Sequence, residues 1–313
     1  MIAVGGVMVV IDTAYLPGSS RLLHELNDLG HIPLFGILGI ALLHLLCGLT
    51  GNCGGRTSLC YALALVGGIS LGVLSELIQY WGPRDADFTD LLKDSVGVVT
   101  ALAIYASFDR RTRERGPLAR PALRRLLRWG GVTTLLIAAT PTILWAISFG
   151  DRNARFPVIY ASDSYWSNRF VRATDAMFGR AGMDVTTDPS GESVTGMELQ
   201  FAFGHYPGIV IMDVYPDWSG YDSLILVMHV PDSSDLALGL RIDDRKNNRE
   251  YWDRFQATME LNPGTNRLAF SLDDIRRSPR NRAMDMTDVV ALLVYGNPTV
   301  AGRRVLLEEI RLK

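Results

Sequence analysis

Long apolar runs in the first 150 residues constrain this chain more than any other feature. Crossing the hydrocarbon core of a membrane takes about 20 mostly apolar residues. Three segments meet or approach that length, residues 31–49, 58–80 and 130–149. A fourth, 91–108, is apolar only from Val96 onward, and a fifth, 1–16, is short and contains Asp12. The sequence therefore predicts a membrane α-helical bundle of about five transmembrane helices.

The segment between the last two apolar runs carries eight arginines against two acidic residues. The positive-inside rule assigns so short and basic a loop, 109–129, to the cytoplasm. This orientation places the N-terminus in the cytoplasm and residues 150–313 outside it, in a multi-pass protein of the inner (plasma) membrane. Membrane lipids with anionic headgroups are the expected partners of the arginines. The formal net charge of −2, from 31 basic and 33 acidic residues, argues against nucleic-acid binding.

Three cysteines lie at or beside loop 50–57, which this orientation places in the cytoplasm: Cys47, Cys53 and Cys60. Because cytoplasmic thiols stay reduced, we expect inert free thiols there. The cysteine spacing matches no zinc-binding pattern. The sequence also has no dense metal-ligand pattern or glycine-rich phosphate loop, so we expect no metal ion and no cofactor.

Residues 75–97 interrupt the apolar region with a concentration of charge. Glu76 lies within an otherwise apolar segment, where an ionisable side chain costs roughly 2.5–3.5 kcal/mol at the membrane centre and usually faces a partner or a cavity. At helical spacing, Asp87, Asp90 and Asp94 share one face. We expect a polar cluster at the outer leaflet that has either a functional or a purely structural role. Its members are His31, Glu76, Gln79, Arg84, Asp87, Asp90 and Asp94.

Two stretches of this region resemble motifs of the VanZ-like family of bacterial membrane proteins. The family motif Asp-Lys-x-x-His-Phe corresponds to Asn27-Asp28-Leu29-Gly30-His31-Ile32. The family series Glu-x-x-Gln, Pro-Gly-Arg and Asp-x-x-x-Asn-x-x-Gly corresponds to Glu76, Gln79, Gly82-Pro83-Arg84, Asp90, Asp94 and Gly97. This chain departs from the pattern at the acid–lysine pair, at Ile32 and at Asp94, where asparagine is usual. The resemblance covers about residues 1–108 and implies a four-span bundle in the cell envelope.

The family resemblance links the bundle to tolerance of glycopeptide antibiotics or envelope stress, without defining a reaction. One alternative is a membrane-embedded enzyme acting on a lipid-linked envelope precursor. In that alternative Arg84 binds a phosphate, since its guanidinium fork suits one, and His31 or Glu76 acts as general base. Whether the chain is an enzyme is left open by the sequence.

The last part of the chain has a different character from the first 150 residues. After a short polar tether at 150–155, residues 156–313 contain about eight short β-rich runs separated by turn signals such as GHYPG, PDWSGYD and NPGT. Strands at this spacing predict an all-β sandwich rather than βαβ units. The order of its segments resembles galactose-binding-like jelly rolls, the fold of many carbohydrate-binding modules. The residues that carry this resemblance are 217–224 (DWSGYDSL), 241–244 (RIDD), 253–255 (DRF), 262–266 (NPGTN) and 311–313 (RLK).

Sugar recognition requires exposed aromatic side chains beside hydrogen-bonding groups. Candidate ligand-binding residues are Trp166, Tyr206, Tyr215, Asp243, Tyr251, Trp252 and Arg254. We expect Trp218 and Tyr221 to pack the sandwich edge, Phe255 to face the core, and one of Tyr251 and Trp252 to be buried. The sequence thus predicts a cell-envelope membrane protein with an extracytoplasmic β-sandwich that binds either an envelope glycan or a protein partner.

Overall fold

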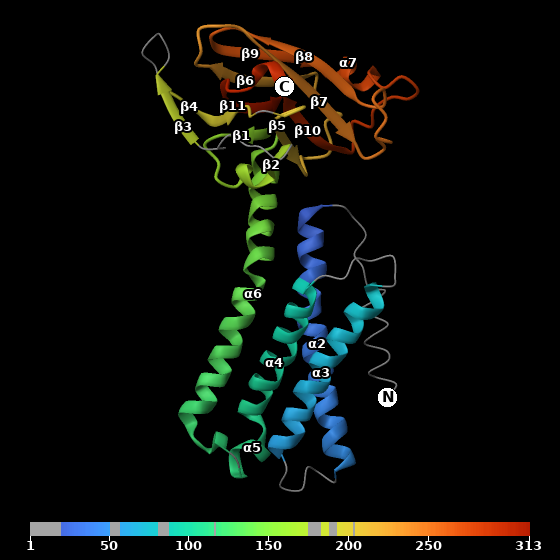
Figure 1. Ribbon diagram of the computed structural model, residues 1–313, viewed down its shortest axis with the longest axis vertical. Helices are drawn as coiled ribbons and strands as arrows, with labels where there is room; N and C mark the ends of the chain where they lie inside the picture. The colour runs from blue at the N-terminus through green and yellow to red at the C-terminus, as the bar shows by residue number, and fades with distance from the viewer. Residues whose placement is uncertain are drawn as a thin grey trace. The chain divides into compact units, whose positions relative to one another are not determined.

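A computed structural model describes residues 20–50, 57–80, 88–115, 117–174, 183–187, 193–202 and 204–313. The chain divides into two compact units, Met1–Ala146 and Ile147–Lys313 (Figure 1). The predicted first span, 1–16, lies outside the described residues, as do Arg84 and Asp87.

The first unit is helical (Figure 1). Four described helices are long and apolar enough to cross a membrane, and they correspond to the last four predicted spans. The Ser20 side chain caps the first of them by accepting a hydrogen bond from the Leu23 N–H. The helices of this unit are α2 (Arg21–Leu49), α3 (Thr57–Tyr80), α4 (Phe88–Phe108), α5 (Arg110–Arg115), the 3₁₀ helix η1 (Pro117–Ala119) and α6 (Pro121–Arg155), which continues into the second unit.

Helix α6 is longer than the expected span 130–149. It begins at Pro121, so part of the expected loop 109–129 is helical. Proline is well suited to the first turn, because the missing N–H would have no partner there. The helix ends only at Arg155, so the expected tether at 150–155 is helical too. Pro157 explains this end point, since proline disfavours helical conformation in the residue before it.

Helices α2, α3 and α4 pack around a core that includes Phe35, Leu38, Leu43, Val98 and Leu102. At Gly97, α4 packs tightly against α2, because a Cβ atom there would overlap the carbonyl oxygen of Ile32. Small residues at such crossings let helix backbones pack closely, a common feature of membrane proteins. Cys60 is a free buried thiol, as expected, but Cys47 is disulfide-bonded. The cysteines therefore give no support to a reducing compartment around residues 50–57.

The second unit is a sandwich of two antiparallel β-sheets, which confirms the predicted β-sandwich. One sheet has the order β3-β4-β11-β6-β9, with β1 paired to β11, and the other has the order β2-β5-β10-β7-β8. The strands are β1 (Val158–Ala161), β2 (Val171–Thr174), β3 (Met183–Thr187), β4 (Ser193–Gln200), β5 (Gly208–Met212), β6 (Ser223–Val230), β7 (Leu236–Asp244), β8 (Phe255–Leu261), β9 (Gly264–Ser271), β10 (Val289–Tyr295) and β11 (Arg304–Leu312). Three short helices, η2 (Ser167–Phe170), α7 (Leu272–Arg277) and η3 (Pro298–Val300), connect them.

Alternation along the strands fills the sandwich core. In β7, Leu238, Leu240 and Ile242 are buried, whereas the residues between them are on the opposite face of the sheet. Phe255 is buried, as predicted. Trp218 is fully buried, and its indole N–H donates to the Tyr215 carbonyl oxygen at 2.7 Å. The outward-facing positions of β7 belong to the site described next.

Candidate functional site

The outer face of the five-stranded sheet β2-β5-β10-β7-β8 gathers aromatic and polar side chains. Residues directly opposite each other in an antiparallel ladder point to the same face. In β7, Arg241 lies opposite Leu293 of β10 on one side and Gln256 of β8 on the other. Tyr295 follows Leu293 by two residues, so its side chain is on the same face as that of Arg241. We call the resulting set the tyrosine–arginine face: Tyr206, Arg241, Asp243, Tyr251, Arg254, Gln256 and Tyr295.

Tyr295 occupies the centre of this face. Its ring lies over Gly239 of β7, where a Cβ atom would overlap the ring. Tyr206 meets the same ring edge-on, with ring centroids 5.9 Å apart. The Gln256 amide lies 3.4 Å from the Tyr295 hydroxyl group. Glycine at 239 therefore lets a tyrosine lie flat against the sheet, with its hydroxyl among polar neighbours.

Arg241 and Asp243 form a two-point ion pair beside Tyr295. Arg241 donates to the two carboxylate oxygens of Asp243 at 2.9 and 2.8 Å. Asn247 donates a further hydrogen bond to Asp243 at 3.1 Å. Such two-point geometry holds both planar groups in fixed positions.

Arg254 and Tyr251 form the other end of the face. The Arg254 guanidinium lies 5.2 Å from the centre of the Tyr251 ring. With its amide oriented to satisfy both ends, Gln256 accepts from Arg254 Nε and Nη2 at 3.2 Å and donates to the Tyr251 hydroxyl at 3.3 Å. Partial burial, together with the neighbouring Arg241 charge, lowers the pKa of Arg254. Burial raises the pKa of Tyr295.

A three-residue clamp fixes the turn that carries Tyr251 and Arg254. Arg282 donates to Asp244 Oδ1 at 2.7 Å and to Asp253 Oδ1 at 2.5 Å. Asp244 ends β7, and Asp253 immediately precedes Arg254. The clamp therefore joins both ends of the β7–β8 turn to the segment before β10.

The structure places four of the seven predicted ligand-binding residues on this face: Tyr206, Asp243, Tyr251 and Arg254. Trp252 is adjacent, edge-on to Tyr251, with the Arg280 guanidinium 3.4 Å from its ring centre. The expectation that one of Tyr251 and Trp252 is buried is wrong, because both lie in a turn and not in a strand, and both are more than half exposed.

The other two predicted residues pack elsewhere. Tyr215 stacks on Phe156, with ring centroids 3.9 Å apart, and Trp166 lies edge-on to Tyr165. Among the described residues, no hydrogen bond or ring contact joins either one to the tyrosine–arginine face. Sequence reasoning missed Arg241, Gln256 and Tyr295 as site residues. The available sequence signal was the alternation in β7, where Gly239, Arg241 and Asp243 alternate with the apolar residues Leu238, Leu240 and Ile242.

The helical unit brings together part of the predicted polar cluster. His31 Nδ1 lies 2.9 Å from Asp94 Oδ1, and His31 Nε2 lies 3.9 Å from Asp90 Oδ2. Lys93, which sequence reasoning missed, bridges Asp28 at 2.8 Å and Asp90 at 3.3 Å. We call His31, Asp28, Asp90, Lys93 and Asp94 the histidine–aspartate cluster.

Glu76 is buried on α3, and Asp94 is only 1% exposed on α4. Asp94 lies against α3 at Gly72, where a Cβ atom would be 3.3 Å from the carboxylate. No hydrogen bond among the described residues reaches Asp94 Oδ2. The side chain of Gln79 and all of Arg84 and Asp87 lie outside the described residues, so their membership of the cluster remains a prediction.

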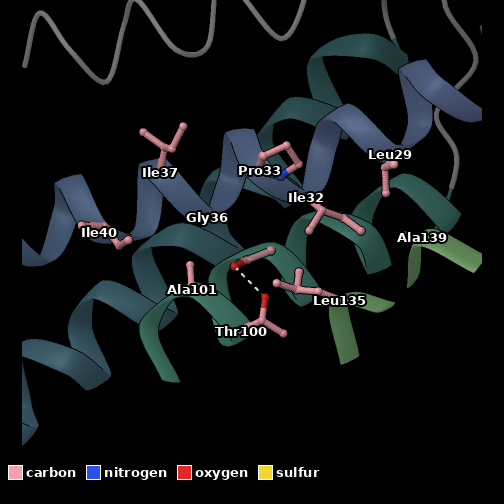
Figure 2. A pocket seen from close by; sticks show the side chains of 11 residues that line it. Leu29, Ile32, Pro33, Gly36, Ile37, Ile40, Thr100, Ala101, Leu135 and Ala139 are labelled. Carbon is pink, nitrogen blue, oxygen red and sulfur yellow. Dashed lines mark hydrogen bonds between the residues drawn. The ribbon is translucent and has the colours of Figure 1, made fainter. Parts of the chain in front are cut away.

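An apolar pocket of about 420 Å³ lies between α2, α4 and the first-unit part of α6 (Figure 2). Ile32 and Gly97, each close in sequence to the cluster, line it together with Leu135 and Ala139 of α6. The Thr100 hydroxyl turns back to its own helix and donates to the Val96 carbonyl oxygen at 2.6 Å. The pocket consequently presents an almost wholly apolar surface next to a charged cluster.

No protein-family model and no curated protein sequence matches this chain, so the VanZ-like resemblance of residues 1–108 remains a prediction.

Similar solved structures include an exo-β-agarase, 14% identical with a TM-score of 0.39 over 50% of this chain and 24% of that one. This chain thus spans about a quarter of the agarase's length. Others are carbohydrate-binding modules. A family 11 module from Clostridium thermocellum, in complex with a beta-1,3-1,4-mixed-linked tetrasaccharide, is 13% identical with a TM-score of 0.35 over 46% of this chain and 88% of the module. The CBM22-1 xylan-binding domain from Paenibacillus barcinonensis is 13% identical, with a TM-score of 0.33 over 50% of this chain and 94% of the domain. At these TM-scores the likenesses carry no functional argument, and the sandwich assignment rests on the strand pairing.

Proposed function

We propose that this chain is an integral membrane protein of the bacterial cell envelope whose β-sandwich binds a carbohydrate outside the cytoplasm. The observation that carries the proposal is the tyrosine–arginine face itself. The four apolar helices of membrane-spanning length support the membrane assignment. The arginine-rich segment between α4 and α6 supports an orientation with that segment in the cytoplasm.

The chemistry of the face suits a sugar. A pyranose ring has apolar C–H surfaces and a rim of hydroxyl groups, so its binding site needs aromatic rings beside hydrogen-bonding groups. Tyr206 and Tyr251, 61% and 55% exposed, offer rings near the more buried Tyr295. The ion pair, the amide and the guanidinium next to them supply donors and acceptors in fixed positions.

The test uses the full chain in lipid nanodiscs and a panel of immobilised polysaccharides. We expect retention by at least one polysaccharide. Retention should be about thirtyfold weaker for Tyr295→Ala, because a central aromatic truncation typically costs about 2 kcal/mol of binding free energy. The matched control is Tyr165→Ala, which removes an exposed tyrosine away from the face. Retention by no polysaccharide, or equal losses in the two variants, would contradict the proposal. Capture of a protein instead of a polysaccharide would favour the alternative that the sandwich binds a protein partner.

A second candidate function belongs to the helical unit: action on a lipid-linked envelope precursor. The observation that favours it is a histidine held between two carboxylates beside an apolar pocket. Asp94, within hydrogen-bond distance of Nδ1, would fix the imidazole tautomer with its proton on that nitrogen and leave Nε2 as a base. The pocket would accommodate an apolar chain of the substrate.

This second candidate is tested by Asp94→Asn, Glu76→Gln and Arg84→Ala in strains challenged with envelope-targeting antibiotics. We expect each change to abolish the phenotype of the wild-type gene while the protein remains in the membrane at a normal level. Glu114→Gln, an exposed carboxylate on α5, is the matched control. Full function in all three variants would exclude a chemical role for the cluster.

A further inference from the structure

Arg254 is held differently from its neighbours Arg241 and Arg282. Arg241 pairs with Asp243, and Arg282 pairs with Asp244 and Asp253. No carboxylate among the described residues lies within ion-pair distance of Arg254. Its polar contact is with the neutral Gln256 amide, and its guanidinium lies beside the Tyr251 ring. Within the described part of the chain, a cationic group is thus held in place on the face without an ion-paired carboxylate of its own.

The charge of the face as a whole has the same sign. The register places Arg172 of β2, Val210 of β5, Leu293 of β10 and Arg241 of β7 in one row across the sheet. Three arginines, at positions 172, 241 and 254, therefore lie on the outer side of this sheet, against two carboxylates: Asp243, which is ion-paired with Arg241, and Glu260 of β8, which lies between the buried Met259 and Leu261. A ligand that enters this region meets a net positive field, which favours anions.

The geometry of Arg254 suits an anion that offers two oxygens side by side. A guanidinium presents parallel N–H donors that match two oxygens of a carboxylate or a phosphate. Two of these donors are already directed at Gln256, whose amide fixes the plane of the group. The remaining donors are available to a ligand. The partial burial of Arg254 strengthens its interaction with an arriving charge.

We propose that the carbohydrate bound by the tyrosine–arginine face is acidic, with a uronic-acid carboxylate paired to Arg254 and its sugar ring against Tyr251 or Tyr295. This inference rests on the proposed carbohydrate-binding function and names its ligand class. A neutral glycan would leave the Arg254 charge without a partner in a partly dehydrated site, which costs binding free energy. The arrangement therefore discriminates against neutral chains as well as attracting acidic ones.

The test compares polyuronates with matched neutral chains, using the full chain in lipid nanodiscs. The probes are polygalacturonate, its fully methyl-esterified form, alginate, hyaluronan and dextran. We expect binding to at least one polyuronate, no comparable binding to dextran, and loss of polygalacturonate binding on esterification. Binding should also weaken as salt rises from about 0.05 to about 0.5 M, because ions screen the pair.

The variants assign this selectivity to one residue. Arg254→Gln should weaken polyuronate binding about tenfold to hundredfold, the range for hydrogen bonds to a charged group, and Arg254→Lys should restore only part of it. Arg276→Gln, an exposed arginine on α7, should change nothing. Equal binding of acid and ester forms, or an undiminished Arg254→Gln, would overturn this inference while leaving carbohydrate binding intact. Binding to no glycan at all would overturn both proposals.

Discussion

Replacing Arg282 with glutamine should destabilise the β-sandwich by about 3 kcal/mol. The Asp244 side chain is fully buried, and Arg282 is 23% exposed, so the change leaves a buried carboxylate without its counter-ion. Breaking such a pair typically costs about 3–5 kcal/mol. The expected loss is at the lower end of that range, because the Asp285 N–H still donates to Asp244 at 2.8 Å. For a unit of this size, the loss corresponds to a Tm about 6–12 °C lower.

The assay is thermal unfolding of the full chain in detergent, with hydrogen exchange resolved over residues 245–254. We expect faster exchange in this turn, and weaker glycan binding, because the clamp positions Tyr251 and Arg254. Asp244→Asn added to the variant should restore part of the stability by removing the uncompensated charge. Arg276→Gln removes an exposed ion pair and should cost less than about 1 kcal/mol. If Arg282→Gln and Arg276→Gln lower the free energy of unfolding by the same amount, the clamp argument is refuted.

Three further predictions concern acid stability, helix packing and topology. Hydrogen bonds from Lys246 and then Thr287 lower the pKa of Asp285 from 3.8 to about 2. Its stabilising effect is therefore present above about pH 4 and lost as pH falls towards 2, and acid titration of Lys246→Gln should show a smaller loss than wild type. Gly97→Ala should lower the Tm of the helical unit in detergent by separating α2 from α4, whereas Gly48→Ala, which meets no neighbour, should not; equal effects would contradict the packing argument. An impermeant maleimide applied to intact cells should label Ser219→Cys in the sandwich above the parent chain, and labelling only after lysis would reverse the proposed orientation.

The sequence predicted element types better than element ends. Apolar length sufficed to predict α2, α3, α4 and α6, each of which is long and apolar enough to cross a membrane. It did not predict that α6 would extend at both ends, because Arg124, Arg125 and Arg128 read as a loop although arginine is a good helix former. Strand alternation identified most strands, but the pairing of β1 with β11 joins residues about 150 positions apart and leaves no local signal.

From the sequence alone, members of the tyrosine–arginine face could be predicted only where the residue type and a nearby turn indicated an exposed side chain. Tyrosines near turns led to Tyr206 and Tyr251, which the structure places on the tyrosine–arginine face. Tyr295 closes the apolar strand VVALLVY, so it reads as a core residue until the register with β5 and β7 places it on the outer face. Tyr215 and Trp166 have the same local sequence character as Tyr206 and Tyr251, and only their tertiary packing, against Phe156 and Tyr165 respectively, places them elsewhere.

In both units a glycine on one element makes room for the side chain or backbone that shapes the site. Gly97 lets the α2 backbone approach α4, and this crossing lies one turn from the contact between His31 and Asp94. Gly239 does the same for the Tyr295 ring on the tyrosine–arginine face. A larger residue at either position would leave every polar side chain of the site in the sequence while moving the partners apart. The geometry of both sites therefore depends partly on glycines, which have no functional side chain. A list of reactive or aromatic residues would not include them.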